Sequence, residues 1–159
     1  MCSSDLGAGA LVSNTTASNS TAVGYQALFI NDGSNNSAFG YKALYGNTSG
    51  VVNAAFGRET LATNTTGSYN TGFGTNALYS NTTASNNTAI GYQSAYSNTT
   101  GNNTSVGYQS LYSNTTGYQN TAIGELALRS NTTAHNNTAI GYQAGIVIRL
   151  VQAMLRLVV

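Results

Sequence analysis

The feature that most constrains this chain is a five-residue phrase that returns every 16 or 17 residues. Its clearest copy is Asn120-Thr121-Ala122-Ile123-Gly124, and related copies run from residue 20 to residue 141. The glycines that close the copies are Gly24, Gly40, Gly57, Gly74, Gly91, Gly107, Gly124 and Gly141. A short period of this kind is typical of a solenoid, in which each repeat contacts only its neighbours. We therefore predict a stack of small coils.

The residues before each glycine predict a short strand. A large apolar residue directly precedes the glycine, a small residue precedes that one, and Thr or Ser usually comes first. This period-two pattern, rich in β-branched residues, is typical of a strand. We expect the large residue to face the core; these residues are Val23, Phe39, Phe56, Phe73, Ile90, Val106, Ile123 and Ile140. The glycine is expected to form a corner, because it adopts backbone angles forbidden to other residues.

The segment after the corner carries a second apolar position, four residues beyond the glycine. We expect it to face the core; it is occupied by Leu28, Leu44, Leu61, Leu78, Leu111 and Leu128. Residues 125–129 consist of good helix formers, and tyrosines at the first and fifth positions have the spacing of one helical face. A strand would also place both tyrosines on one side, so both structures remain open, and a short helical turn is slightly favoured. We expect the tyrosines to be buried between coils or between subunits.

An asparagine follows in every full repeat. The column is Asn31, Asn47, Asn64, Asn81, Asn98, Asn114 and Asn131. Its side chain can bond its own backbone in a turn, and in a stack identical Asn side chains can bond one another along the axis. A Thr pair usually follows and forms a possible surface array of Thr65, Thr66, Thr82, Thr83, Thr99, Thr100, Thr115, Thr116, Thr132 and Thr133. Changes of one residue in the period fall between this Asn and the next strand, as expected for a surface loop.

Composition argues against several classes of function. Charged residues make up only 6% of the chain, and five scattered basic residues leave a net charge of +1, so the basic stripe of a nucleic-acid-binding protein is missing. The four acids and His135 neither recur in register nor pair as a general acid and base would. A single Cys permits no disulfide within the chain and no thiolate cluster. We expect no enzymatic activity, no metal, no cofactor and no nucleic-acid partner.

The repeat resembles two known groups. The phrase Asn-Thr-Ala-Ile-Gly at 87–91, 120–124 and 137–141 is similar to the repeat in the heads of trimeric autotransporter adhesins. The longer form at 107–117 resembles repeats of bacterial and phage tail-fibre proteins, which often end in a self-cleaving chaperone domain. The resemblance implies a parallel β-roll-like fold, a homotrimer, host attachment and an extracellular place on a cell surface or virion. The period is longer here than in the adhesin heads, which leaves space for the suggested helical turn.

Three regions are expected. Residues 1–19 form a non-repeat segment with a partial repeat, and residues 1–6 resemble a translated sequencing adapter and are interpreted as an artefact. Residues 20–144 form a solenoid of about eight coils. Residues 145–159 are apolar but too short to span a bilayer, which takes about 20 residues, and are interrupted by Arg149 and Arg156. A terminal cap and a frame-shifted tail are the two interpretations of that stretch, and the chain looks like a fragment of a longer protein.

The sequence favours a structural or adhesive fibre segment, a rigid spacer that contacts cell-surface glycans through Tyr and Asn side chains. Two large aliphatic residues per coil make a thin core, which favours self-association of several chains. The alternative is an ice-binding solenoid, in which the stacked Thr pairs would form a regular hydroxyl grid on a flat strand. Asn-Thr-Thr also matches the N-x-Ser/Thr glycosylation pattern, which a sequence rich in Asn and Thr generates by chance.

Overall fold

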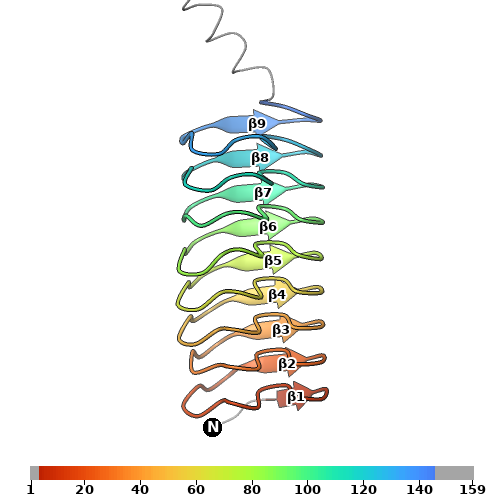
Figure 1. The fold of residues 1–159 in the computed structure, drawn as a ribbon, viewed down its shortest axis with the longest axis vertical. Coiled ribbons are helices and arrows are strands. Elements are labelled where there is room, and N and C mark those ends of the chain that lie inside the picture. The colour runs from red at the N-terminus through yellow and green to blue at the C-terminus, as the bar shows by residue number, and fades with distance from the viewer. Residues whose placement is uncertain (1–3, 146–159) are drawn as a thin grey trace, which may run out of the picture.

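The computed structural model describes residues 4–145 and shows a parallel β-solenoid with one strand of three residues per coil. The nine strands are β1 Ser4–Leu6, β2 Thr21–Val23, β3 Ser37–Phe39, β4 Ala54–Phe56, β5 Thr71–Phe73, β6 Thr88–Ile90, β7 Thr104–Val106, β8 Thr121–Ile123 and β9 Thr138–Ile140. They form a single sheet in chain order, and every pairing is parallel (Figure 1). The predicted fold class, a mainly β repeat solenoid, is confirmed.

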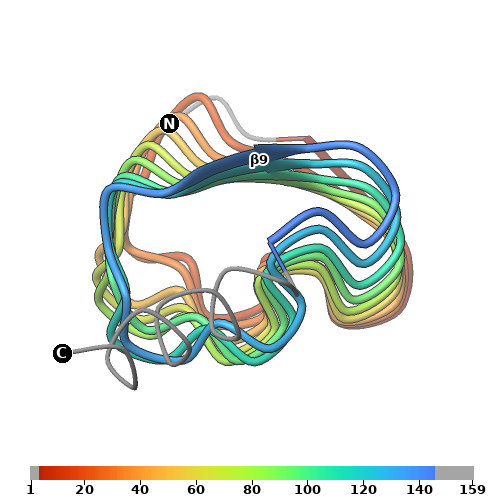
Figure 2. The ribbon, with the colours of Figure 1, turned by 90° about the horizontal axis from the view of Figure 1, so that it is seen from above.

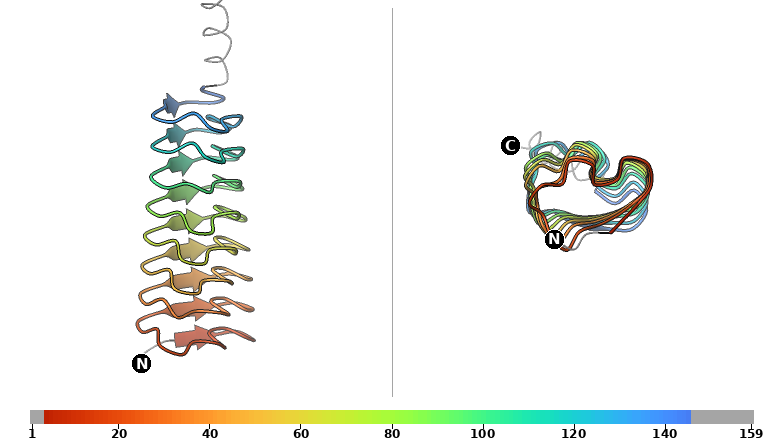
Figure 3. Two further views of the ribbon diagram at one scale, coloured as in Figure 1. Left: turned by 60° about the vertical axis from the view of Figure 1, so that its left-hand side comes forward. Right: turned by 90° about the horizontal axis from the view of Figure 1, so that it is seen from below.

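The register keeps equivalent residues in columns. Thr88 pairs with Thr104, Ala89 with Ser105 and Ile90 with Val106, and the other pairs follow the same rule. Seen along the axis, the coils superimpose with only a slow rotation from one end to the other (Figure 2). The strands all lie on one side of the coil, as the two further views confirm (Figure 3). Eight pairings at ~4.8 Å each make a rod about 38 Å long.

The large residue before each glycine does not face the core, so this prediction was wrong. The small middle residue of the strand points inward, as in Ala22 and Ala89, which are fully buried. Its large neighbour points out: Phe73 is 56% exposed and Ile90 is 40% exposed. The correction applies to Val23, Phe39, Phe56, Phe73, Ile90, Val106, Ile123 and Ile140, all of which are exposed or half-buried.

The reason is the narrow interior. A Cβ added at Gly72, the middle residue of β5, would lie 2.5 Å from Cγ2 of Thr60 and 3.6 Å from Cδ1 of Leu61. In this coil the opposite wall leaves no space even for a Cβ, and in the other strands of β2–β9 the middle residue is Ala or Ser. Because strand side chains alternate, a small inward residue places both of its neighbours outside.

The leucines fill the interior as predicted. Leu28, Leu44, Leu61, Leu78 and Leu111 are fully buried, and Leu128 is 5% exposed. They pack in one continuous core with the strand alanines and with the alanine that precedes Leu28, Leu44, Leu78 and Leu128. The core of the rod is therefore a column of Leu against columns of Ala.

The segment after the glycine is a turn, and the favoured helical turn was wrong, since residues 4–145 contain no helix. Left-handed backbone angles occur at the second and fourth positions, with φ of 54° at Gln26 and 48° at Leu28. These angles interrupt any helix. The N–H of Leu28 donates to the carbonyl of Ala43 in the next coil at 3.0 Å. Bonds between coils thus replace the bonds within a helix.

The corner glycines behave as predicted. The eight predicted residues have φ between 121° at Gly141 and 137° at Gly40. They also stack in a column, because a Cβ at Gly107 would lie 2.4 Å from the carbonyl oxygen of Gly124. The corner therefore requires Gly both for its backbone angle and for its close approach to the next coil.

The stack begins earlier than expected. Ser4–Leu6 forms β1 and pairs with β2, and Gly7 has the corner angle, with φ of 139°. Gly7 lies 17 residues before Gly24, so it belongs to the same period. Residues 1–3 and 146–159 lie outside the described residues, and with them nearly all of the predicted cap or tail.

Candidate functional site

The outer strand face is a repetitive surface that runs along the rod. We use this name for the two outward rows of β2–β9: the first residue of each strand, usually Thr, and the large apolar residue. Phe39, Phe56 and Phe73 stack there with ring centroids 4.7 and 5.7 Å apart. Beyond them the apolar row continues as Ile90, Val106 and Ile123. An apolar row exposed along the whole rod is an unusual feature of a soluble monomer and indicates an interaction surface.

The predicted Asn column forms a ladder in the interior. Asn31, Asn47, Asn64, Asn81, Asn98 and Asn114 are fully buried, and Asn131 is half-buried. The amide of Asn64 donates to Oδ1 of Asn47 at 2.7 Å and to the carbonyl of Gly67 at 2.9 Å. Both predicted roles, the turn within a coil and the ladder between coils, are confirmed. These side chains are therefore unable to contact a glycan.

The ladder is interrupted at the two coils that are one residue shorter. In most coils the ladder Asn lies six positions before the Asn that precedes the strand, but Asn31 and Asn36 are five positions apart, as are Asn98 and Asn103. There the two columns touch, and Asn103 donates to Oδ1 of Asn98 at 3.1 Å. Asn98 donates to the carbonyl of Thr100 rather than to Asn81, and Nδ2 of Asn31 is buried without a partner. The predicted location of the length change, between the ladder Asn and the next strand, is confirmed.

A second Asn column was missed. It directly precedes the strands and consists of Asn36, Asn53, Asn70, Asn87, Asn103, Asn120 and Asn137. Oδ1 of Asn53 accepts the backbone N–H of Asn70 at 2.9 Å, and its Nδ2 donates to the carbonyl of Gly67 at 2.8 Å. The signal was present in the sequence, because this Asn opens the recurring phrase.

The Thr pairs lie outside the strands, and most of them are exposed. The first Thr of several pairs donates its hydroxyl to the next coil, as Thr65 does to the carbonyl of Thr82 and Thr115 to that of Thr132, both at 3.0 Å. These hydroxyls therefore join neighbouring coils. The predicted array exists as a column, but it lies on a bend and not on the flat strand that a hydroxyl grid requires.

Two rows of aromatic rings lie beyond the corner, and the first row is exposed, so its rings are not buried between coils. Tyr92 and Tyr108, at the first position after the glycine, are 46% and 48% exposed and stack at 5.5 Å. The half-buried second row, at the fifth position, stacks Tyr79 on Tyr96 at 5.2 Å and Tyr96 on Tyr112 at 5.3 Å. Burial raises the pKa of the Tyr96 phenol, and the neighbouring Tyr79 and Tyr112 add to the effect.

A row of amides runs between the aromatic rows. Gln109 donates to Oε1 of Gln93 at 2.8 Å, and Arg129 donates through Nε to Oε1 of Gln109 at 3.1 Å. The Arg129 guanidinium also lies over the ring of Tyr112, 5.6 Å from its centroid. In an earlier coil Nζ of Lys42 lies 5.4 Å from the Tyr41 centroid and 5.3 Å from the Tyr45 centroid, which shows that the first, second and fifth positions converge.

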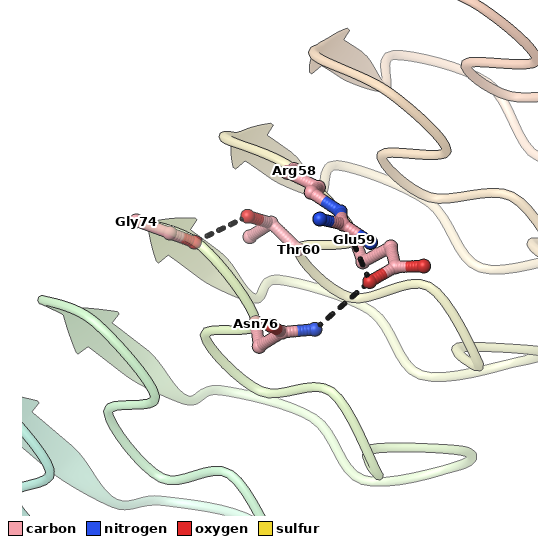
Figure 4. Close-up of polar contacts among 5 residues, drawn as sticks. All are labelled: Arg58, Glu59, Thr60, Gly74 and Asn76. Carbon is pink, nitrogen blue, oxygen red and sulfur yellow. Dashed lines mark hydrogen bonds and ion pairs between the residues drawn. The ribbon is translucent and has the colours of Figure 1, made fainter.

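Ionisable groups form no catalytic constellation among residues 4–145. The one ion pair within the described part of the chain joins Nε of Arg58 to Oε2 of Glu59 at 3.5 Å, and Asn76 donates to the same carboxylate at 3.3 Å (Figure 4). No group of three His, Cys, Asp or Glu side chains in this part of the chain could hold a metal ion. His135 stacks on Tyr118 at 4.6 Å. No helix in the described part is suited to cross a bilayer.

Asp32 has a structural role in the first coils. Its carboxylate accepts hydrogen bonds from the hydroxyl of Thr15 at 2.5 Å and from the backbone N–H groups of Thr15 and Thr16 at 3.1 and 3.3 Å. The Thr15 hydroxyl is the largest of the causes that lower the pKa of Asp32. In a later coil the carbonyl oxygen of Thr82 accepts the N–H groups of Thr65 and Thr66. The Asp32 carboxylate replaces this carbonyl as the acceptor in the first coils.

Comparison with known proteins gives no matching family model, no similar curated protein and no similar solved structure. Function is therefore inferred from the surface geometry of the rod itself.

Proposed function

We propose that this chain is a segment of the rigid shaft of an extracellular surface fibre, of the kind found in adhesins and phage tail fibres. The observation that carries the proposal is the exposed apolar row on a rod whose coils are joined at every level. Such a shaft spaces a binding tip from a cell surface or virion and attaches to a host without catalysis.

Rigidity follows from the bonds between coils. Each coil is held to the next by strand pairing, by backbone bonds such as Leu61 N–H to the Ala77 carbonyl at 3.0 Å, and by side-chain bonds in two Asn columns. Bending the rod would strain many of these bonds at once. A spacer needs this property, whereas an enzyme needs a cavity with convergent reactive groups.

Self-association follows from the outer strand face. Large side chains such as Phe73 and Ile90 are about half exposed, and full burial of each is worth roughly 1.5–3 kcal/mol, so covering the exposed part gains about 1 kcal/mol per residue. The row runs along the whole rod and carries no charged residue in β2–β9. We infer a parallel homotrimer with the three strand faces turned to a common axis: closed symmetry covers every copy of the face, and three copies are what the resemblance to the repeats of trimeric adhesins implies.

Sedimentation velocity and small-angle X-ray scattering test the proposal. We expect trimers at micromolar concentration and a rod about 38 Å long for the described coils. Ile90→Asp together with Ile123→Asp should give folded monomers, and Thr83→Asp, on the loop side, should leave the trimer intact. A wild-type chain that is monomeric and folded at micromolar concentration would refute self-association through this face.

An ice-binding function receives no support from the Thr pairs. Several of their hydroxyls are used between coils, and the pairs lie on bends. A thermal hysteresis measurement checks this directly, and we expect none.

A further inference from the structure

The two aromatic rows and the amide row between them form one continuous surface. We call it the Tyr–Gln surface and define it by Tyr92, Gln93, Tyr96, Tyr108, Gln109 and Tyr112. We propose that it binds a linear, uncharged, extended polysaccharide that lies parallel to the rod axis. The inference rests on the proposed function, because it names what the shaft contacts.

The spacing along the axis is the first argument. Coils repeat every ~4.8 Å along the axis, and the centroids of equivalent rings lie 5.2 to 5.5 Å apart. Both distances are close to the length of one pyranose unit in an extended β-1,4-linked chain. Two successive sugars of such a chain can therefore meet equivalent groups of the two coils that carry the Tyr–Gln surface.

The polar groups are the second argument. The phenol hydroxyls of Tyr92, Tyr108 and Tyr112 make no hydrogen bond to any described residue. A phenol hydroxyl both donates and accepts, and a Gln amide that bonds its neighbour with one hydrogen keeps a second donor. The surface thus presents rows of donors and acceptors, which match the hydroxyl groups of a sugar chain.

The mode of contact is the third argument. The rings stack at interplanar angles of 4° to 14°, so each ring has at least one face covered by its neighbour, and Tyr96 has both faces covered. The sugar ring therefore contacts the edges of the stacked rings rather than the covered faces between them. It lies across the row of edges and bonds hydroxyl to hydroxyl, with its C–H groups against the ring carbons.

The surface is also preorganised. The stacked rings support one another, and Arg129 holds Gln109 at 3.1 Å while Gln109 holds Gln93 at 2.8 Å. Little side-chain entropy is lost when a ligand binds to groups that are already fixed.

Charge favours a neutral ligand. Arg129 at one end of the surface is offset by Glu125 of the same coil, and Tyr92, Gln93, Tyr96, Tyr108, Gln109 and Tyr112 carry no charge at neutral pH. No row of cations is available to select a polyanion.

Ligand-observed saturation-transfer NMR with defined oligosaccharides tests the inference on the wild-type chain. The probes are cellohexaose and chitohexaose, which are extended, and maltohexaose, whose α-linked chain curls. We expect transfer to both extended probes and little to maltohexaose, because only an extended chain keeps register with the coils. Absence of transfer to both extended probes, or equal transfer to maltohexaose, would overturn the inference.

A double variant tests the residues. Tyr92→Phe with Tyr108→Phe keeps both rings and their stack but removes two hydroxyls, and we expect an affinity roughly ten-fold lower for cellohexaose. The matched control is Tyr69→Phe, which removes an exposed hydroxyl from a ring outside the Tyr–Gln surface and should change nothing. Equal affinity of the double variant and the wild type would overturn the assignment.

The two proposals fail in different ways. Loss of the trimer or of the rod shape in sedimentation and scattering refutes the shaft. A trimeric rod that transfers no saturation to cellohexaose or chitohexaose refutes only the Tyr–Gln surface.

Discussion

The pair Thr60 and Gly72 offers the sharpest test of how tightly the interior is packed. Thr60 lies three residues after a corner glycine, and Gly72 is the middle residue of the next strand. Equivalent pairs in other coils include Ala27 with Ala38, Ala43 with Ala55, Ala77 with Ala89, and Ala127 with Ala139. Thr60 is larger than the Ala of these pairs, and Gly72 opposite it is correspondingly smaller. We predict that Gly72→Ala destabilises the rod, although Ala stands at this position in six other strands.

The magnitude follows from the geometry. The added Cβ would lie 2.5 Å from Cγ2 of Thr60, about 1 Å inside a normal carbon–carbon contact of 3.5–4.0 Å. Thr60 is fixed, because it is buried and its hydroxyl donates to the carbonyl of Gly74 at 2.6 Å (Figure 4). Overpacking of this kind costs about 1–3 kcal/mol, and replacing Gly by Ala where φ is permitted returns about 0.4–1 kcal/mol. The expected net loss is about 1–2 kcal/mol.

Urea unfolding followed by circular dichroism measures the effect. The informative background is Thr60→Ser, which removes Cγ2 and keeps the hydroxyl. The equivalent pair Ser110 and Ala122 shows that Ser and Ala fit together. In that background Gly72→Ala should be neutral or stabilising, with a coupling energy of about 1–3 kcal/mol. If Gly72→Ala costs the same with Thr60 and with Ser at position 60, the steric explanation is refuted.

Three further predictions concern polar groups. Asn64→Ala should lower the free energy of unfolding by about 2–4 kcal/mol, because it leaves buried ladder partners unsatisfied, whereas exposed Thr83→Ala should change it by less than about 0.5 kcal/mol in the same urea assay. The pKa of Asp32 is lowered by its Thr15 bonds, so its stabilisation is present above the ordinary Asp pKa of about 3.9 and is lost as the pH falls below it. Hydrogen exchange at the Thr15 amide should show this loss in the wild type and not in Asp32→Asn. The pKa of Tyr96 is raised, so its stabilisation is complete below the ordinary Tyr pKa of about 10 and is lost as the pH rises from that value through the raised pKa of the folded state. Tyr96→Phe should move the alkaline unfolding transition, followed by circular dichroism, to higher pH, and an unchanged transition would contradict the assignment.

The period of the sequence was sufficient to predict the stack. One glycine every 16 or 17 residues places equivalent residues in columns. The columns in turn predicted the corner glycines, the buried leucines and the Asn ladder. These features depend only on repetition and on the chemistry of one residue type.

The orientation of the strand could not be predicted in the same way. Alternation shows that Ala122 and Ile123 point to opposite sides, but it does not show which side is inside. Hydrophobicity favours Ile inside, whereas the width of the coil, set by Leu and by the turn that carries it, admits only Ala. That width is a property of the closed coil and is not present in any local stretch of sequence.

The turn after the glycine was missed for a related reason. Leu28 and Gln26 adopt left-handed angles that local rules assign to Gly, Asn and Asp. Burial of the Leu28 side chain and the bond from its N–H to Ala43 hold the angle in place. The left-handed angle is unfavourable for Leu28 itself, and the hydrogen bond that offsets it comes from the neighbouring coil. A short stretch of sequence therefore does not contain both. Sequence reasoning also left the Tyr–Gln surface undefined, since its rows meet only through this turn.

The abundance of N-x-Ser/Thr patterns has a structural explanation in the same bonds. In Asn64-Thr65-Thr66 the Asn donates both amide hydrogens inside the rod, and the hydroxyl of Thr65 donates to the Thr82 carbonyl. A sugar on that amide would displace two buried hydrogen bonds and could not fit in the closed coil. Glycosylation before folding would therefore block stacking, so the pattern reflects what the coil needs at these two positions. The same requirement explains the low charge of the chain, because Asn and Thr join coil to coil without the desolvation that buried ions would cost.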